Sequence, residues 1–314
     1  MKFDFNDINL VPQKCVVYSR NECSTKVKLG IHEFNIPIIP ANMECVINEE
    51  IAINLFNNGY FYIMHRFGDT YSFMKKLKKL GILTSISIGV NEDSYQILNK
   101  LLHENLIPDY ITIDIAHGHS VLVEKMIKYL KSNFTSFIIA GNISTAEAVI
   151  DLEKWGADAT KVGIGPGSAC TTYPATGFGS RNCQASVIYE CSKVATKPII
   201  ADGGIKEPGD ISKSLCMGAT MVMIGGMLSG YSDSPGNTIE YNGKRFKEFW
   251  GSASVHQSNK KDRIEGKKIL IDYKDQTMLE GYQYLKECLQ SSISYGGGKD
   301  LSCFKNVKFI TKWD

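Results

Sequence analysis

Residues 198–226 read PIIADGGIKEPGDISKSLCMGATMVMIGG, and this stretch indicates the fold more clearly than any other. Two short apolar runs, Pro198–Ala201 and Met221–Ile224, flank an amphipathic segment, and a glycine pair follows each run. Apolarity that is continuous rather than alternating is typical of parallel strands buried on both faces. The stretch therefore predicts a strand, a helix and a second, parallel strand.

The same alternation of apolar runs and amphipathic segments recurs along the chain. The predicted strands are Ile36–Pro40, Tyr60–Met64, Thr84–Ile88, Tyr110–Ile115, Phe137–Ala140, Thr160–Ile164, Pro198–Ala201 and Met221–Ile224. Apolar positions at three- and four-residue spacing predict helices at Glu49–Asn58, Tyr71–Leu80, Asp93–Asn105, Ser120–Lys131, Thr145–Trp155, Cys183–Val194, Ile211–Met217 and Gln276–Leu289. Eight strands that alternate with helices favour a (β/α)8 TIM barrel over an open doubly wound sheet.

The alternation stops after the eighth predicted strand. Residues 232–268 are polar and too long for an ordinary connection, so we expect a functional flap or loop there. Because α/β barrels of this length are commonly one domain, residues 1–314 are expected to form a single catalytic domain.

The charge balance and the cysteine spacing argue against several classes of protein. The chain has 35 Lys and Arg against 33 Asp and Glu, a balance that argues against nucleic acid or a membrane as partner. Its nine cysteines are irregularly spaced and form no CxxC pair, which favours reduced thiols and a cytoplasmic location over disulfides or a zinc site. No apolar run approaches the ~20 residues of a membrane helix.

The active site of a (β/α)8 barrel lies at the C-terminal ends of its strands, so we expect the functional residues in the loops that follow the strands. GIGPGSACTT, residues 163–172, follows the sixth predicted strand. Its glycines and proline allow a sharp turn and close approach to a ligand, and its small residues leave the thiol of Cys170 reachable. We interpret Cys170 as a covalent nucleophile and Ser168 as a phosphate contact. The other eight cysteines are expected to be packed structural thiols.

Two glycine pairs follow the last two predicted strands. Asp202 at the end of the seventh strand suits a ribose, since a carboxylate accepts hydrogen bonds from two hydroxyls. Loops after strands seven and eight commonly bind phosphate in this fold. The predicted phosphate contacts in these loops are Gly203, Gly204, Gly225 and Gly226.

The loop after the fourth strand, DIAHGHS at 114–120, carries Asp114 and a candidate helix N-cap, Ser120. Polar groups at a strand end are typical of ligand contacts. The GxGxxG fingerprint of dinucleotide-binding folds does not follow an early strand. A nicotinamide cofactor would therefore have to bind in another mode.

Taken together, these loops resemble the purine-nucleotide dehydrogenase and reductase family, which comprises IMP dehydrogenase and GMP reductase. The matching motifs, in family order, are NDINLVP (6–12), IIPANM (38–43), GIGPGSACTT (163–172), TGFG (176–179), IIADGGI (199–205), GATMVMIGG (218–226) and SISYGGG (292–298). The resemblance covers nearly the whole chain. It implies a barrel with a mobile flap and a homotetramer.

Within the family the sequence is more similar to the reductase branch, particularly its second bacterial type. Met64 passes directly into a short helix, without the regulatory insertion that most IMP dehydrogenases carry. The adjacent Arg-Tyr pair by which dehydrogenases activate water does not occur between residues 232 and 268. DIAHGHS, GFGSRNCQ and GSAS…EGKK also fit the reductase. An IMP dehydrogenase lacking the regulatory insertion is the alternative.

The resemblance implies NADPH-dependent reductive deamination of GMP to IMP with release of ammonia, a reaction of purine nucleotide salvage. Cys170 would attack carbon 2 of the purine, and Thr172 and Glu265 would shuttle a proton to the leaving amine. The implied contacts to ribose and phosphate are Asp202, Ser168, Gly204, Gly225 and Gly226, and those to the base are Gly251, Ser252 and Gly266.

The resemblance also implies a cofactor site and a cation site. The cofactor contacts would be Asp114, Ile115, Ala116 and Arg66, with Ser19 and Arg20 from a neighbouring subunit. Arginines suit the extra phosphate of NADPH. The carbonyls of Gly165, Gly167 and Cys170 match the potassium loop of the family. Tyr173 is a departure, because relatives often carry Arg or Lys after the catalytic threonine.

Overall fold

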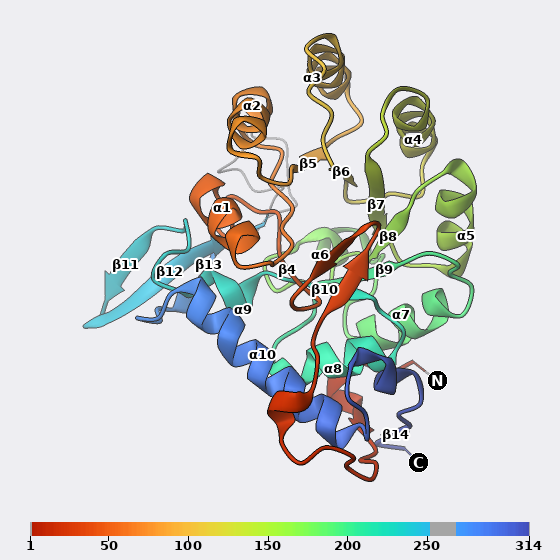
Figure 1. Cartoon of the computed structure of the whole chain (residues 1–314), viewed down its shortest axis with the longest axis vertical. Coiled ribbons are helices and arrows are strands. Elements are labelled where there is room, and N and C mark those ends of the chain that lie inside the picture. Colours follow the sequence, from red (N-terminus) through yellow and green to blue (C-terminus); the bar gives the residue numbers. More distant parts are fainter. Residues whose placement is uncertain (1, 252–267, 314) are drawn as a thin grey trace.

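The computed structural model describes residues 2–251 and 268–313. Its centre is a curled seven-stranded parallel sheet with helices around its outer side (Figure 1). The strands lie in the order β4-β10-β9-β8-β7-β6-β5. Their bounds are β4 Ile38–Pro40, β5 Ser85–Ile88, β6 Tyr110–Asp114, β7 Phe137–Ile143, β8 Ala159–Val162, β9 Ile199–Asp202 and β10 Met221–Ile224. Seven of the eight predicted strands are thus present, with shifted ends.

The remaining predicted strand, Tyr60–Met64, is wrong as a strand. Residues 60–63 are buried, which explains their strand-like apolarity. Their main chain meets β5 through a hydrogen bond from Met64 N to Ser85 O at 3.1 Å rather than through a ladder. β4 and β5 are therefore the two end strands of this sheet.

Polar N-caps begin most of the outer helices. Asn48, Asp69, Asn91, Ser120 and Thr145 each accept a hydrogen bond from a backbone N–H of the first helical turn. The helices are α1 Glu49–Asn57, α2 Thr70–Leu80, α3 Glu92–His103, α4 Val121–Asn133, α5 Ala146–Trp155, α7 Gln184–Ser192, α8 Pro208–Cys216 and α10 Met278–Tyr295, with short α6 Thr172–Thr176 and α9 Gly226–Ser229. All eight predicted helices are present, and none of the described helices could span a membrane.

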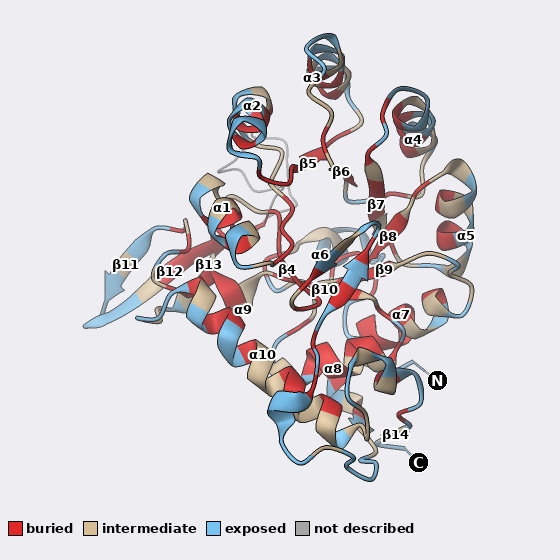
Figure 2. Cartoon of the chain, in the orientation of Figure 1, coloured by how far each residue is buried: buried red, intermediate tan, exposed pale blue. Residues whose placement is uncertain are grey.

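The core lies between the sheet and the inner faces of these helices. Figure 2 shows the strands as buried and the outward faces of α2, α3 and α4 as exposed. Residues of β4, β5, β8 and β10 are all buried. Burial on both faces is what the continuous apolar runs predict for parallel strands.

A hairpin packs against the N-terminal ends of the strands. It is formed by β2 Val27–Leu29 and β3 His32–Phe34. The hydroxyl of Tyr110, the first residue of β6, donates to Leu29 O at 2.7 Å. The turn glycine Gly30 has φ +60°, and a Cβ there would lie 2.8 Å from the ring of Phe137 at the start of β7. The hairpin thereby covers the end of the sheet opposite the predicted active-site loops.

The two ends of the chain meet on the same side of the molecule. Strand β1 Ile8–Leu10 pairs antiparallel with β14 Phe309–Thr311. Short 3-10 helices, η1 Phe5–Asp7, η2 Arg20–Glu22 and η3 Leu301–Lys305, lie near these strands in the sequence. Sequence patterning missed these short elements because each contains too few residues to show a period.

The segment predicted as a polar loop is, where it is described, an antiparallel sheet of β11 Thr238–Tyr241, β12 Lys244–Trp250 and β13 Lys268–Asp272. Asn242 and Gly243 connect β11 and β12 with φ values of +51° and +71°. An Asn-Gly pair between β-forming residues is a strong hairpin signal, so this part of the loop prediction is corrected. Residues 252–267 of the predicted flap lie outside the described residues.

Candidate active site

A large cavity opens at the carboxyl ends of the sheet strands. Its volume is about 1170 Å³. Its lining comes from the residues that follow β4, β6, β8, β9 and β10, together with residues of β12 and β13. The predicted site residues that line it are Arg66, Asp114, Ile115, Ala116, Gly165, Gly167, Ser168, Cys170, Thr172, Asp202, Gly203, Gly204, Gly225, Gly226 and Gly251.

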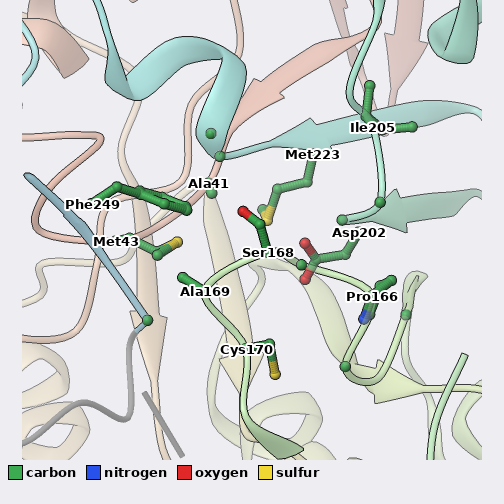
Figure 3. A pocket seen from close by; sticks show the side chains of 18 of the residues that line it. Ala41, Met43, Pro166, Ser168, Ala169, Cys170, Asp202, Ile205, Met223 and Phe249 are labelled. Atoms are coloured by element: carbon green, nitrogen blue, oxygen red, sulfur yellow. The ribbon is translucent and has the colours of Figure 1, made fainter. Parts of the chain in front are cut away.

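The loop after β8 holds the candidate nucleophile. Cys170 is half-buried, its N–H donates to Gly167 O at 3.1 Å, and its Sγ donates to Thr172 Oγ1 at 3.4 Å. Figure 3 shows Ser168 and Cys170 along this loop, with Asp202 beside it. Gly163 begins the loop at φ +144°, and a Cβ there would lie 2.0 Å from Asp202 O. Only glycine permits this close approach between the loop and the end of β9.

The other thiols occupy different surroundings. Burial raises the pKa of Cys45 and Cys191 to about 12 and that of Cys216 and Cys303 to about 11. Such thiols remain protonated and unreactive near neutral pH. Among the described residues that line the cavity, Cys170 is the one cysteine. The structure thus brings this thiol to a ligand-sized space and places the others elsewhere.

Asp202 ends β9 and turns its carboxylate into the cavity. Its Oδ2 accepts hydrogen bonds from Lys161 Nζ at 2.6 Å and from Asn142 Nδ2 at 2.7 Å. The next two residues, Gly203 and Gly204, have φ values of +84° and +81°. Consecutive glycines in this conformation turn the main chain sharply behind the carboxylate.

The same lysine reaches a second carboxylate. Lys161 Nζ lies 2.9 Å from Asp114 Oδ1, and the lysine side chain is only 2% exposed. Burial alone would raise the pKa of Asp114, but the charge of Lys161, with that of Arg66, lowers it. Burial alone would lower the pKa of Lys161, but the two aspartates raise it above its usual range. Asp114 and Lys161 are therefore both charged near neutral pH.

The glycine pair after β10 lies close to the loop of the nucleophile. A Cβ at Gly226 would lie 3.8 Å from Ser168 Oγ, and one at Gly225 would lie 3.1 Å from the Phe249 ring. The main chain at this pair can therefore approach a ligand that Ser168 also contacts. Neutral donors of this kind are suited to a phosphate.

Some predicted site residues are not brought to the cavity. Ser19 caps η2, and Arg20 bonds Ser291 at 3.2 Å and lies 3.8 Å from Glu287. Neither Ser19 nor Arg20 lines the cavity of this chain. Glu265, Ser252 and Gly266 lie outside the described residues.

The loop predicted to hold a cation contains Gly165, Gly167 and Cys170. Gly167 O already accepts the N–H of Cys170, and Gly165 has φ +76°. A Cβ at Gly165 would lie 3.1 Å from that of Tyr173. The guanidinium of Arg181 lies 5.8 Å from the centre of the Tyr173 ring, a cation–π contact beside this loop. Within residues 2–251 and 268–313, no cluster of three His, Cys, Asp or Glu side chains could hold a metal.

Comparison with known proteins identifies the family to which the chain belongs. The model of the IMP dehydrogenase / GMP reductase domain matches residues 2–312. The chain belongs to the IMP dehydrogenase / GMP reductase family. The GMP reductase of Clostridium acetobutylicum is 52% identical over 314 residues, covering 98% of this chain and 95% of that protein. The GMP reductases of Mesoplasma florum and Bacillus subtilis are each 51% identical, covering 98% of this chain and 97% and 95% of their own length.

In this member of the IMP dehydrogenase / GMP reductase family, the cavity also contains polar residues that the sequence analysis did not select. They are Asn42, Asn142, Lys161, Lys206, Asp272 and Lys274. A signal for one of them was present, since Lys161 is a charged residue inside the apolar run 160–164. A charge at such a position is rarely buried without a partner.

Proposed function

We propose that this protein is a GMP reductase, which converts GMP, NADPH and two protons to IMP, ammonium and NADP⁺. The observation that carries the proposal is the Cys170–Thr172 contact at 3.4 Å, in a cavity that also contains the Asp202 carboxylate. Relatives at about half identity over nearly the full chain carry the name GMP reductase, which supports the same reaction.

The nucleophilic step belongs to Cys170. Its sulfur bonds to carbon 2 of the purine, the bond from that carbon to the exocyclic nitrogen breaks, and ammonia leaves after receiving a proton. Thr172 is placed to relay that proton, because its hydroxyl contacts the thiol. The resemblance assigns Glu265 the partner role in this transfer. When carbon 2 becomes reduced, the bond to sulfur breaks and the thiol is restored.

The nucleotide is held by the groups at the ends of β8, β9 and β10. Asp202 accepts hydrogen bonds from the ribose hydroxyls, because its Oδ1 has no bond to Lys161 or Asn142 and stays available. Ser168 and the glycine pairs hold the phosphate. The proposed phosphate and base contacts are Ser168, Gly203, Gly204, Gly225, Gly226, Gly251, Ser252 and Gly266.

The reduction requires a nicotinamide cofactor, and NADPH supplies a hydride to carbon 2. Asp114, Ile115 and Ala116 line the same cavity as Cys170, and the half-buried Arg66 also lines it. A carboxylate suits a ribose and a guanidinium suits a phosphate, so this residue set fits the cofactor. Ser19 and Arg20 would complete the site from a neighbouring subunit of a homotetramer.

The proposal also includes a closed barrel, a cytoplasmic location and a bound potassium ion. A closed (β/α)8 barrel requires Tyr60–Met64 to occupy the gap between β4 and β5, and the bond from Met64 to Ser85 supports this arrangement. The free state of all nine cysteines supports a cytoplasmic location. The carbonyls of Gly165, Gly167 and Cys170 would hold potassium, with Gly167 O shared with the N–H of Cys170.

Two absorbance assays with purified protein test the function. Loss of NADPH absorbance that depends on GMP is the expected result. Formation of NADH from NAD⁺ and IMP, with no GMP-dependent loss of NADPH, would instead identify an IMP dehydrogenase without the regulatory insertion. Inactivity in both assays, at ligand concentrations where binding is measurable, would overturn the proposed reaction.

A further inference from the structure

One buried ammonium connects two carboxylates that the proposed function assigns to different ligands. Lys161 Nζ lies 2.6 Å from Asp202 Oδ2 and 2.9 Å from Asp114 Oδ1. The carboxylate side chains are 17% and 14% exposed, so each still faces the cavity. Asp202 lies on the nucleotide side and Asp114 on the cofactor side. The charged core of the site is therefore shared by both ligands.

The sheet is built so that this lysine can reach both strands. Asp114, Gly141 and Lys161 are in register across β6, β7 and β8. A Cβ at Gly141 would lie 2.6 Å from that of Lys161, so only glycine on the middle strand leaves room for the lysine side chain to cross it. Register and glycine together place the ammonium beside Asp114, two strands away.

Lys161, Asp114 and Asp202 each offset the free-energy cost of burying the others. A buried ammonium or carboxylate without a partner is costly, and two carboxylates facing one point repel each other. Lys161 removes both costs and leaves a net charge of −1 for the trio, from one cation and two anions. Asn142 adds a second donor to Asp202 Oδ2 at 2.7 Å and so fixes the rotation of that carboxylate.

We propose that Lys161 is a positioning residue for both ligands, fixing the direction of Asp202 toward the nucleotide ribose and of Asp114 toward the cofactor. The inference rests on the proposed function. A merely structural lysine would support the fold without affecting how either ligand binds. The two roles differ in their kinetic and pH signatures.

The pH signature follows from the surroundings of Asp114. The groups that face it are Lys161 from β8, Arg66, and Asn42 after β4, with Asp202 across the ammonium. Without the charge of Lys161, burial raises the pKa of Asp114 and moves its titration toward neutral pH. A protonated Asp114 is a weaker hydrogen-bond acceptor for the hydroxyls of a ribose. Cofactor binding should then weaken as the pH falls, which the parent protein should not show between about pH 6 and 8.

The experiment compares Lys161→Met with Lys161→Arg, in the parent chain and in an Asp114→Asn background. Lys128→Met is the matched control, because Lys128 is exposed and pairs with Glu124 on α4 outside the cavity. Lys161→Met should raise the KM for GMP and for NADPH by about tenfold each, and the NADPH effect should grow on acidification. Lys161→Arg should restore much of the pH independence.

The Asp114→Asn background provides the decisive comparison. There, Lys161→Met should leave the KM for NADPH within about twofold while still raising that for GMP, since only Asp202 remains to be positioned. The double variant also keeps the test possible if Lys161→Met does not fold, because it removes one cation and one anion together. KM values for GMP within twofold of the Asp114→Asn parent would overturn the inference. Failure of the proposed function is distinct, since the unmutated protein would then show no GMP-dependent oxidation of NADPH.

Discussion

The two walls of the cavity differ in the groups that they present to a ligand: one presents mainly main-chain atoms and the other charged side chains. The wall that we propose for the nucleotide, called the nucleotide wall, consists mainly of main chain at Gly203–Gly204 and Gly225–Gly226, with Ser168 opposite. The wall that we propose for the cofactor, called the cofactor wall, consists of side chains, with Asp114 held by a buried lysine and Arg66 nearby. Main-chain donors carry no titratable charge, whereas the charged wall depends on which groups are ionised. The nucleotide wall should therefore respond to shape, and the cofactor wall to charge and pH.

The largest expected effect concerns the thiol between the walls. Cys170→Ala should lower turnover by about 10⁴-fold or more, because the covalent step has no substitute. GMP should still bind within a few-fold of the parent affinity, since neither wall changes. Isothermal titration with GMP measures the affinity, and the NADPH assay measures the turnover. Retained turnover would contradict covalent catalysis.

Asp202→Asn tests the carboxylate where the two walls meet. Charge-assisted hydrogen bonds to the ribose should be lost, raising the KM for GMP by roughly 50-fold. The same change leaves Lys161 with Asp114 alone, so the KM for NADPH should change much less. Initial rates at varied concentrations of GMP and of NADPH give the two KM values separately. An equal effect on both constants would place the ribose elsewhere.

Gly225→Ala tests the shape of the main-chain wall. The added methyl would lie 3.1 Å from the Phe249 ring and 3.6 Å from Ala41 Cβ, so the ring must shift into the cavity or away from it. The KM for GMP should rise by about tenfold, with no change in its pH dependence. Gly209→Ala is the matched control, since a Cβ there meets nothing within 4 Å. Equal kinetic constants in the two variants would show that Gly225 does not shape the site.

The smallest expected effect is on stability. Asp114→Asn should cost about 1 kcal/mol at pH 7, because Lys161 keeps Asp202 as a partner. The pKa of Asp114 is lowered in the folded state, so its ionised form stabilises the protein above the unfolded pKa near 3.9. That contribution is lost as the pH falls through the folded pKa. Urea unfolding at pH 7 and at pH 3 should show the difference shrink, and a constant difference would exclude the ion pair as its origin.

The main-chain wall could be predicted from the sequence and the charged wall only in part. Asp202, Cys170 and both glycine pairs follow recognisable strands, and strand ends identify the active face of such a sheet. Lys161 was missed because its role depends on register across three strands, which no local pattern contains. The strand at Tyr60–Met64 was wrong because burial without a ladder has the same sequence pattern as a buried strand.

The hairpin of β2 and β3 has a consequence for how ligands exchange. By packing against the start of β6 and β7, it leaves the carboxyl ends of the strands as the approach to Cys170. Under the proposed function, the nucleotide and the cofactor would both enter and leave through this opening. A turn far from Cys170 thereby helps to limit ligand exchange to one end of the sheet.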